Sequence, residues 1–518
     1  MPTAFVPAAQ SRLSGVRLSV LVFVGGCGTL ATEISASRLL APYFGSSTIV
    51  WANIIGLILI YLSIGYWLGG KLADRRPEPR LLGLLVLVAA VVIAATPFIA
   101  RPILDLAVKG LDAATVGAVV GSFFAALALF AIPVTLLGAV SPFAIRLAIS
   151  DVEQAGTVAG RLYALSTVGS IVGTFLSALV TIPLLGTQRT MLGAAALLVL
   201  GAALLLGRRW QLVTLVFLGL LLIPAGAVKA TQGLLYETES RYQYVQVVER
   251  NDRSRVLKLN EGVAVHSLWR QDSVLTGGEW DMFLMVPPLL DRPVRRMCVI
   301  GNAGGTIARA YGALYPDVEI DGIEIDPKVT EAGRRFMGLG DNPQLHVVTA
   351  DGRPFLQSTD ERYDVIVVDA YRQPYIPFYL ATREFFRLAR ERLVPGGVLA
   401  LNVAQVPGDD RLSEAIGSTL LAEFPQGWAW KPLRFNELML GFDHPVGRPE
   451  VLDRARHVDS RIASLVPLFE RQLRPVRAEV SALTDDQAPV EWLTDRMIVD
   501  YIAEGGGDIE EDLLPTAP

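Results

Sequence analysis

Residues 297–305 read MCVIGNAGG, and residues 320–327 read IDGIEIDP. The first string is an apolar strand that runs into a glycine-rich turn, and the second is an apolar strand that ends in acid. Glycines in such a turn let the backbone approach a ligand, and an acid at the end of the next strand accepts hydrogen bonds from ribose hydroxyls. The pattern predicts a doubly wound sheet that binds a nucleoside, with Glu324 at the ribose.

The alternation of strand and helix continues after Glu324 through the strings LHVVTA, YDVIVVDA and GGVLALNVA. Strands that are apolar throughout and separated by helices indicate a parallel sheet covered on both faces. Ligands bind at the carboxyl edge of such a sheet, so we expect Asp351 beside an adenine and Asp369 at the reacting centre. Four glycines at this edge are expected to line the ligand: Gly301, Gly304, Gly305 and Gly352.

The glycine turn favours a single nucleoside over a dinucleotide. The string GNAGGT lacks the G-x-G-x-x-G spacing of a dinucleotide loop, and no second mononucleotide half follows residue 405. We therefore expect a nucleoside-type cosubstrate rather than NAD.

Composition excludes several other classes. The net charge of -5 gives no bulk attraction for nucleic acid. The two cysteines and four scattered histidines build neither a disulfide framework nor a metal cluster, so we predict no metal site and no tightly bound cofactor.

The first 230 residues predict an all-α bundle of about seven transmembrane helices, because each apolar stretch has about the 20 residues that cross a bilayer. We expect a multi-pass protein of a bacterial inner or plasma membrane, with membrane lipids around it. The stretches are 16–37, 49–70, 81–100, 116–140, 161–185, 190–207 and 210–228.

The orientation of this bundle is ambiguous. Basic residues follow the second, fourth and sixth stretches, which places those loops in the cytoplasm. Seven spans would then put the following domain outside, whereas a nucleoside cosubstrate is cytoplasmic; we expect one span to be miscounted and the soluble domain to be cytoplasmic. Glu33 and Arg38 lie at membrane depth, where a charge is paired or functional, so they form a structural pair or hold a polar head group.

The chain is predicted to be multi-domain. Tyr242–Val248 and Arg255–Leu259 alternate at period two across a turn, which indicates a β-hairpin unit ahead of the Rossmann-like sheet. The expected boundaries are a transmembrane domain over 1–230, a small β-hairpin domain over 231–295, a Rossmann-like domain over 296–445, an extension over 446–503 and a disordered tail over 504–518.

The motif order resembles a known family. A hairpin domain followed by VIGNAGGT, GIEID, ADGRPFL, YDVIVVDA and LVPGGVLALN is similar to the spermidine synthase family of aminopropyltransferases, over roughly 236–445. The helical first half, with EISASRLLAPYFGSS and YLSIGYWLGGKLADR, resembles the membrane-fused spermidine synthase-like proteins of bacteria. The resemblance implies a methyltransferase-like Rossmann fold and decarboxylated S-adenosylmethionine as cosubstrate.

The resemblance assigns roles residue by residue. Gln243 matches the family's hairpin glutamine, Glu324 its ribose-binding glutamate and Asp351 its adenine-side aspartate. Asp369 matches the first aspartate of its D-x-x-D motif. The second aspartate of that motif, the general base, falls on Arg372.

Two further positions depart from the family. Its ammonium-gripping aspartate falls on Gly304, and its Tyr-His-Glu segment is replaced by Trp280-Asp281-Met282. Asp281 is a candidate cosubstrate-binding residue and a candidate base. Asp485, in LTDDQAPVE, is a second candidate base, and Tyr371 is expected to line the acceptor pocket.

Three functions remain open on sequence alone. Aminopropyl transfer to a small-molecule amine such as a polyamine is the first, with Asp369, Tyr371 and Asp485 as catalytic candidates. Methyl transfer from S-adenosylmethionine to a lipid-associated acceptor is the second, because Arg372 at neutral pH cannot act as a base. A non-catalytic sensor or transporter for a nucleoside or polyamine is the third. The resemblance leaves open whether the protein forms a homo-oligomer.

Overall fold

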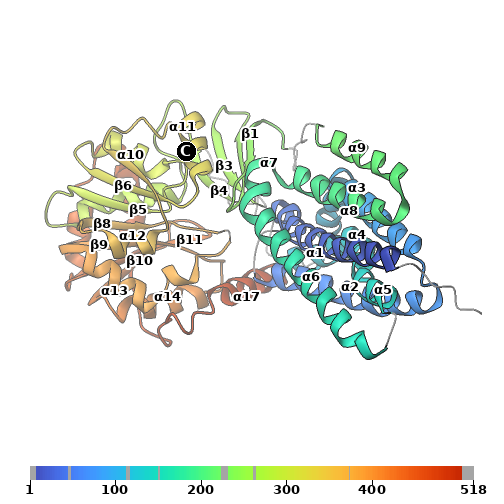
Figure 1. Cartoon of the computed structure of the whole chain (residues 1–518). Helices are drawn as coiled ribbons and strands as arrows, with labels where there is room; N and C mark the ends of the chain where they lie inside the picture. The colour runs from blue at the N-terminus through green and yellow to red at the C-terminus, as the bar shows by residue number, and fades with distance from the viewer. Residues whose placement is uncertain are drawn as a thin grey trace, which may run out of the picture. The chain divides into compact units, whose positions relative to one another are not determined.

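The structure is a computed structural model that divides into two compact units (Figure 1). One unit comprises Met1–Ala230 and Glu239–Gln243, and the other comprises Thr231–Thr238 and Tyr244–Pro518. The residues that the structure describes are 8–44, 48–112, 117–149, 152–222, 231–260, 264–372 and 374–503. The predicted disordered tail, 504–518, lies outside them.

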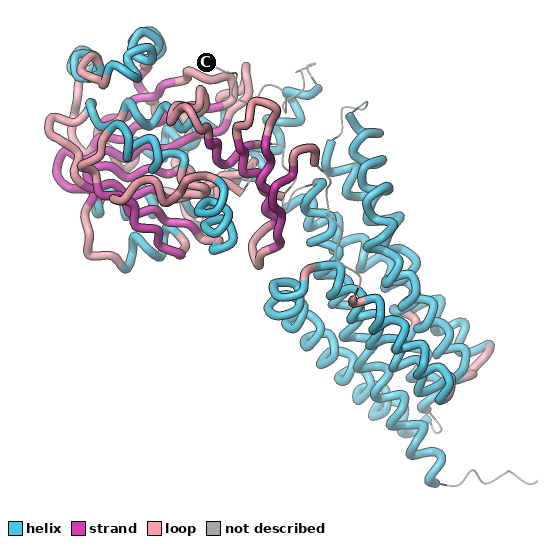
Figure 2. The backbone as a smooth tube through the Cα atoms, turned by 90° about the horizontal axis from the view of Figure 1, so that it is seen from above, coloured by secondary structure: helices cyan, strands magenta, loops and turns pink. Residues whose placement is uncertain are grey.

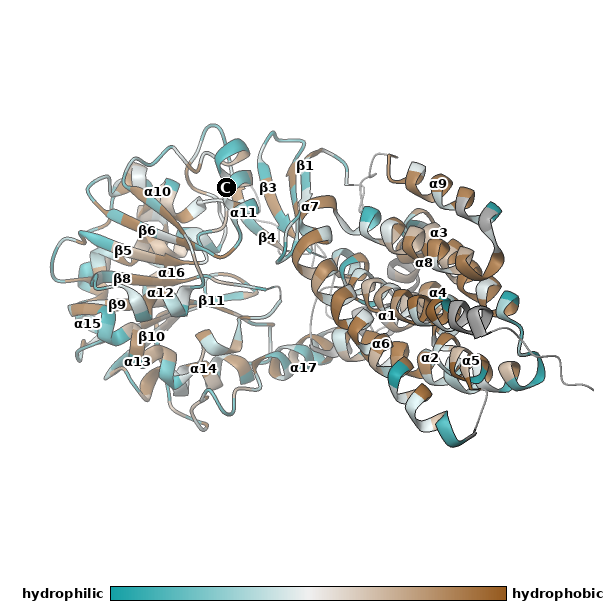
Figure 3. Cartoon of the chain, viewed as in Figure 1, coloured by the Kyte–Doolittle hydropathy of each residue, from teal (hydrophilic) through white to brown (hydrophobic). Residues whose placement is uncertain are grey.

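The first unit is helical, and its helices are predominantly apolar (Figure 3). Six helical segments among the described residues are long and apolar enough to cross a membrane. They are Gly15–Phe44, Val50–Arg75, Pro79–Leu104, Phe123–Ala148, Ala155–Leu185 and Thr187–Leu206. The helices of this unit are α1 (Ala8–Phe44), α2 (Thr48–Arg75), α3 (Pro79–Asp112), α4 (Gly117–Gly138), α5 (Val140–Ala148), α6 (Ala155–Leu176), α7 (Ile182–Leu185), α8 (Thr187–Leu206) and α9 (Gln211–Leu220).

The seventh predicted stretch, 210–228, differs from the other six. Helix α9 covers only Gln211–Leu220 of it, and residues 223–230 lie outside the described part of the chain. Ten residues of α-helix rise about 15 Å, about half of a bilayer core. The described residues therefore support six spans, one fewer than the seven expected.

Small residues bring α1 and α6 into close contact. A Cβ added at Gly169 would lie 2.0 Å from the carbonyl oxygen of Phe23, and one at Gly173 would lie 2.2 Å from that of Cys27. Side chains larger than hydrogen would push the two backbones apart, and close backbone approach is what stabilises helix pairs in lipid. Near the end of α1, Arg38 donates a hydrogen bond to the carbonyl of Arg241, in the loop that groups with this unit.

The second unit begins with a four-stranded sheet in the order β1-β2-β3-β4. Strands β2 and β3 form the predicted hairpin, with Val245 opposite Leu259 and Glu249 opposite Arg255. The strands are β1 (Leu234–Glu239), β2 (Tyr244–Glu249), β3 (Arg255–Leu259) and β4 (Val265–Trp269).

The second sheet of this unit has eight strands in the order β12-β10-β11-β9-β8-β5-β6-β7. Strands β5 to β9 pair in parallel, as predicted, whereas β10, β11 and β12 are antiparallel. The strands are β5 (Arg296–Ile300), β6 (Glu319–Glu324), β7 (Leu345–Thr349), β8 (Tyr363–Val368), β9 (Leu393–Ala404), β10 (Gln426–Trp430), β11 (Asn436–Phe442) and β12 (Arg474–Pro475).

Helices cover both faces of this sheet (Figure 2). Alternate residues of a strand belong to two separate hydrophobic cores, one on each face of the sheet. In β5, Met297 and Val299 belong to one core, and Cys298 and Ile300 belong to the other. The helices are α10 (Thr306–Leu314), α11 (Pro327–Phe336), α12 (Gly352–Ser358), α13 (Arg383–Arg392), α14 (Arg411–Leu421), α15 (Arg448–Ala455), α16 (Val466–Gln472) and α17 (Val490–Ala503).

The extension predicted over 446–503 shares these cores. Val446 and Phe469 belong to one cluster, and Met497 and Tyr501 of α17 belong to the other. The extension therefore packs on the sheet and contributes a helix close to the site described below.

Candidate active site

The strand order reverses direction between β5 and β8, and the glycine turn lies there. The chain runs from β5 to β6 and β7 on one side and to β8 and β9 on the other, so the crevice at the carboxyl ends of β5 and β8 is the expected ligand site. Gly301 follows β5 with φ of 88°. A Cβ there would lie 2.4 Å from the carbonyl oxygen of Asp369. Glycine is required because the ends of β5 and β8 touch at this point.

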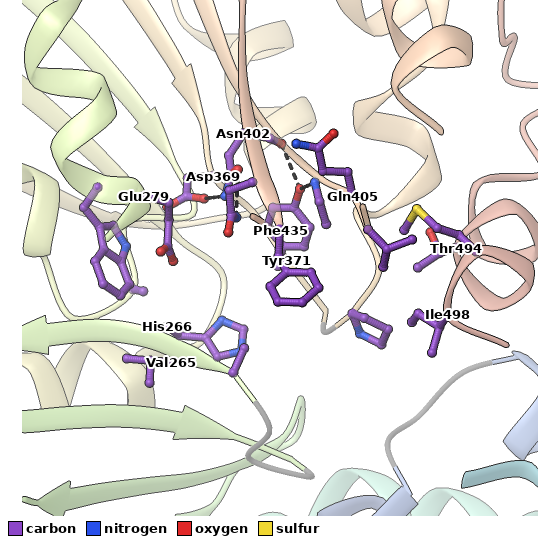
Figure 4. Close-up of a pocket in the computed structure, with 18 residues that line it drawn as sticks. Val265, His266, Glu279, Asp369, Tyr371, Asn402, Gln405, Phe435, Thr494 and Ile498 are labelled. Carbon is purple, nitrogen blue, oxygen red and sulfur yellow. Dashed lines mark hydrogen bonds between the residues drawn. The ribbon is translucent and has the colours of Figure 1, made fainter. Parts of the chain in front are cut away.

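Asp369 follows β8, and its carboxylate faces a cavity at this crevice (Figure 4). Asn402, on β9, donates a hydrogen bond from Nδ2 to Oδ1 of Asp369 over 2.9 Å. Burial raises the pKa of Asp369 to about 6, and the Asn402 hydrogen bond opposes that rise because it stabilises the ionised form. Asp369 is therefore mainly ionised at pH 7 and able to accept a proton.

A second acid, Glu279, lines the same cavity from the 3-10 helix η4 (Glu279–Met285). Burial, followed by repulsion from the charge of Asp369, raises the pKa of Glu279 to about 8. Two carboxyl groups in one cavity thus share a preference for a cation or for a retained proton. The sequence analysis did not single out Glu279; the only local signal is that Glu279 stands three residues before the apolar run 282–290.

The rest of the cavity wall is mostly apolar and encloses about 130 Å³. Tyr371 forms part of the wall, but its hydroxyl is already engaged: it donates to the carbonyl of Asn402 over 2.8 Å and accepts from the N–H of Ala404 over 2.7 Å. These contacts fix the ring of Tyr371 as a surface for a ligand. The other lining residues are Ala264, Val265, His266, Trp280, Ala303, Pro374, Gln405, Val406, Phe435, Asn436, Thr494, Met497 and Ile498.

The glycine-turn side of the crevice fits a nucleoside. Glu324, at the end of β6, is 7 % exposed, and its carboxylate accepts from the N–H groups of Ala303 and Asp326. Burial raises the pKa of Glu324 to about 7. Beside it, the side chain of Asn302 is 4 % exposed, and neither its oxygen nor its nitrogen has a hydrogen-bond partner among the described residues. A buried amide without partners is costly, and a polar ligand at the turn would satisfy it.

Asp351 begins α12 on the same edge. Its carboxylate accepts from the N–H of Arg353 over 3.1 Å and from the hydroxyl of Tyr379 over 2.8 Å. Packing explains why residue 352 is a glycine, because a Cβ there would lie 2.3 Å from a methyl carbon of Ile300.

Gly304 and Gly305 shape the turn through close packing. The N–H of Gly304 donates to Oγ of Ser267 over 2.8 Å, and the N–H of Gly305 donates to the carbonyl of Asn302 over 2.8 Å. Gly305 has φ of 85°. Both N–H groups are therefore already engaged within the protein.

Of the predicted site residues, only Asp369 and Tyr371 line the cavity. Three of the others also lie outside the glycine turn and the strand ends described above. The Asp281 carboxylate is turned inward and accepts from Thr276 and Gly277, so it stabilises a turn. Asp485 forms a two-bond ion pair with Arg353 of α12. Gln243 belongs to the loop that groups with the helical unit.

Arg372, which stands where a base was expected, is exposed, and its backbone pairs with that of Tyr375. The second acid of the cavity is instead Glu279, which comes from a different element, η4.

Comparison with known proteins agrees with the motif order. A family model described as "Spermine/spermidine synthase domain" matches residues 281–415, which include Glu324, Asp351 and Asp369. The chain therefore contains a spermidine synthase-like domain. The matched region covers strands β5 to β9, which build the crevice, and η4 from Asp281 onward; Glu279 lies just before it.

Two curated relatives of this family extend the comparison. A "Probable polyamine aminopropyl transferase" of Bifidobacterium longum is 33 % identical over 302 residues, covering 54 % of this chain and 66 % of the relative. A "Polyamine aminopropyltransferase" of Vibrio vulnificus is 31 % identical over 175 residues, covering 33 % of this chain and 58 % of the relative. The chain thus spans just under two thirds, or less, of the length of these relatives.

Among solved structures, a probable spermidine synthase from Corynebacterium glutamicum has a TM-score of 0.38 and 16 % identity, covering 50 % of this chain and 100 % of that one. The fold assignment for this spermidine synthase-like protein rests on its own strand order.

We expect Glu324→Ala to weaken binding of an S-adenosyl nucleoside by about 2 kcal/mol, about thirtyfold, because a charge-assisted hydrogen bond to ribose is lost. Calorimetric titration of methylthioadenosine measures this loss. The control is Glu361→Gln, at an exposed acid ahead of β8 on the opposite edge of the sheet. Equal affinity of Glu324→Ala and the unchanged protein would contradict the assignment.

Proposed function

We propose that this protein transfers the aminopropyl group of decarboxylated S-adenosylmethionine to an amine acceptor. The observation that supports the proposal most directly is the cavity at the strand crossover, where Glu279 and Asp369 line a mainly apolar wall. An amine binds as a cation and must lose a proton before it attacks, and a buried pair of carboxyl groups serves both needs.

The reaction is a displacement at carbon. The deprotonated amine nitrogen forms a bond to the methylene carbon beside the sulfonium, the carbon–sulfur bond breaks, and its electron pair stays on the sulfur of methylthioadenosine. The proton of the attacking ammonium passes to Asp369 and then to solvent. Tyr371 and Trp280 hold the acceptor in line, and proximity supplies much of the rate.

The glycine turn favours this donor over S-adenosylmethionine. The extra carboxylate of S-adenosylmethionine needs N–H donors or a cation, and two nearby donors, the N–H groups of Gly304 and Gly305, are already engaged within the protein. Methyl transfer to a lipid-associated acceptor remains the second candidate function.

We also propose that the helical unit is integral to a membrane with its carboxyl end in the cytoplasm. The six candidate spans among the described residues, an even number, put both ends of the bundle on one side. The basic loops after the second, fourth and sixth spans then all face the cytoplasm, where the donor is made.

The test uses the full-length protein in detergent micelles with each donor and a mixture of primary amines. We expect methylthioadenosine from decarboxylated S-adenosylmethionine. Release of S-adenosylhomocysteine from S-adenosylmethionine would establish methyl transfer instead. Donor binding without either product would support a non-catalytic sensor or transporter.

The pH dependence of this reaction follows from Asp369. Because the base must be ionised, kcat/KM should rise with pH through a midpoint near 6, the pKa of Asp369. Asn402→Ala removes a hydrogen bond that stabilises the ionised form, so the midpoint should move upward by about one unit. Initial rates between pH 5 and 8 measure both values. An unmoved midpoint in Asn402→Ala would contradict the assignment of Asp369 as the base.

A further inference from the structure

The cavity has two chemically different ends. Figure 4 shows Glu279 and Asp369 on one side and Thr494 and Ile498 of α17 on the other, with Tyr371 and Phe435 between them. Glu279 and Asp369 are the only acids among the described residues of the cavity wall. The negative charge that receives a cationic amine therefore lies at one end.

The end formed by α17 is neutral. Met497 and Ile498 of α17 are apolar and line the cavity there. Thr494 is 1 % exposed and its hydroxyl donates to the carbonyl of Val490 within the helix, so that donor is used internally. This end of the cavity presents carbon surface to a ligand.

Two acids of α17 are engaged elsewhere. Asp495 accepts a hydrogen bond from the hydroxyl of Tyr375 over 2.5 Å, and Asp500 pairs with Arg411 over 2.6 Å. These contacts point the two carboxylates to other partners and hold the helix in place. Helix α17 thus contributes its uncharged face to the cavity.

Gln405 adds a polar group that cannot balance a charge. Its side chain lines the cavity, is 2 % exposed, and has neither amide atom paired among the described residues. A neutral amide can hydrogen-bond a ligand, but a second ammonium buried here would lack a counter-ion, which is strongly unfavourable.

From this asymmetry we propose that the acceptor is a monoamine with an apolar tail, with its nitrogen at Glu279 and Asp369 and its tail against α17. A buried linear diamine carries a second ammonium that needs a counter-ion, and among the described residues both acids of the cavity wall lie at one end. Helix α17 lies beyond residues 281–415, so its residues act as specificity determinants supplied by the carboxyl-terminal extension. This inference rests on the proposed function and names the substrate class of the same site.

The test compares acceptors of equal length with the full-length protein and decarboxylated S-adenosylmethionine. Hexylamine should give a kcat/KM at least tenfold above that of 1,6-diaminohexane. Likewise, butylamine should give a higher kcat/KM than 1,4-diaminobutane. A kcat/KM for the diamine equal to or above that for the monoamine would overturn the inference while leaving aminopropyl transfer intact.

Ile498→Asp places an acid at the tail end and should reduce or reverse the preference for the monoamine. The control is Val499→Asp, one residue along the same helix, where the side chain is 52 % exposed and outside the cavity wall. An unchanged preference in Ile498→Asp would count against the role of α17. If no amine consumes the donor, the proposed function fails, and calorimetric binding of hexylamine against 1,6-diaminohexane then decides the preference by itself.

Discussion

Asp369→Asn is expected to lower kcat about a thousandfold, because asparagine cannot accept a proton from the attacking amine and general-base catalysis contributes roughly 10²–10⁴. The replacement keeps the shape of the side chain, and its oxygen can still accept the hydrogen bond from Asn402. Donor affinity and thermal stability should therefore change little. Methylthioadenosine release under saturating amine measures the effect.

Asp360→Asn is the matched control, since Asp360 is exposed just before β8, at the opposite end of the strand from Asp369. It should retain full turnover. If Asp369→Asn also retained full turnover, the proton would have to go elsewhere, and Glu279→Gln would be the next variant to measure. Loss of donor binding in Asp369→Asn would show that Asp369 holds the donor rather than acting as the base.

Gly301→Ala is expected to destabilise the fold by about 3 kcal/mol and to abolish turnover. The backbone at Gly301 has φ of 88°, a region that costs a non-glycine residue about 1–2 kcal/mol. The new Cβ would also lie 2.4 Å from the carbonyl oxygen of Asp369, so the ends of β5 and β8 would have to separate. Thermal unfolding of the purified protein measures the loss of stability.

Gly340→Ala is the control for this prediction. Gly340 is exposed, and a Cβ there would meet nothing within 4 Å, so its melting temperature should stay within a degree or two of that of the unchanged protein. If Gly301→Ala melted at the same temperature as Gly340→Ala, the close contact between β5 and β8 would not matter for stability.

Part of the site could be predicted from local sequence. The run Met297–Ile300 is apolar throughout and is followed by glycine, which predicts a buried parallel strand and a tight turn, and both are present. Glu324, Asp351 and Asp369 stand at strand ends by sequence position alone, and the parallel register brings those ends to one edge. The resemblance assigned their roles.

Other parts could not be predicted locally. Glu279 begins the 3-10 helix η4, whose sequence has no helical or strand periodicity, so the local sequence does not indicate that Glu279 faces Asp369. Met497 and Ile498 lie more than a hundred residues after Asp369 and read as one face of an ordinary helix. The sequence analysis named Asp485 and Asp281 as candidate bases. In the folded chain Asp485 pairs with Arg353, and Asp281 accepts hydrogen bonds from the 276–277 turn.

Local sequence is enough to predict the parallel sheet, the glycine turn, the acids at the carboxyl edge of the sheet and an apolar helical first half, because periodicity and turn chemistry act between near neighbours. The tertiary structure is needed to show which acids line the same cavity and which acids form ion pairs elsewhere. It is also needed to show that α17 forms an uncharged wall opposite the acids. These outcomes depend on contacts between residues distant in the chain, and burial of two carboxyl groups in one cavity changes their pKa values in a way that no local pattern encodes.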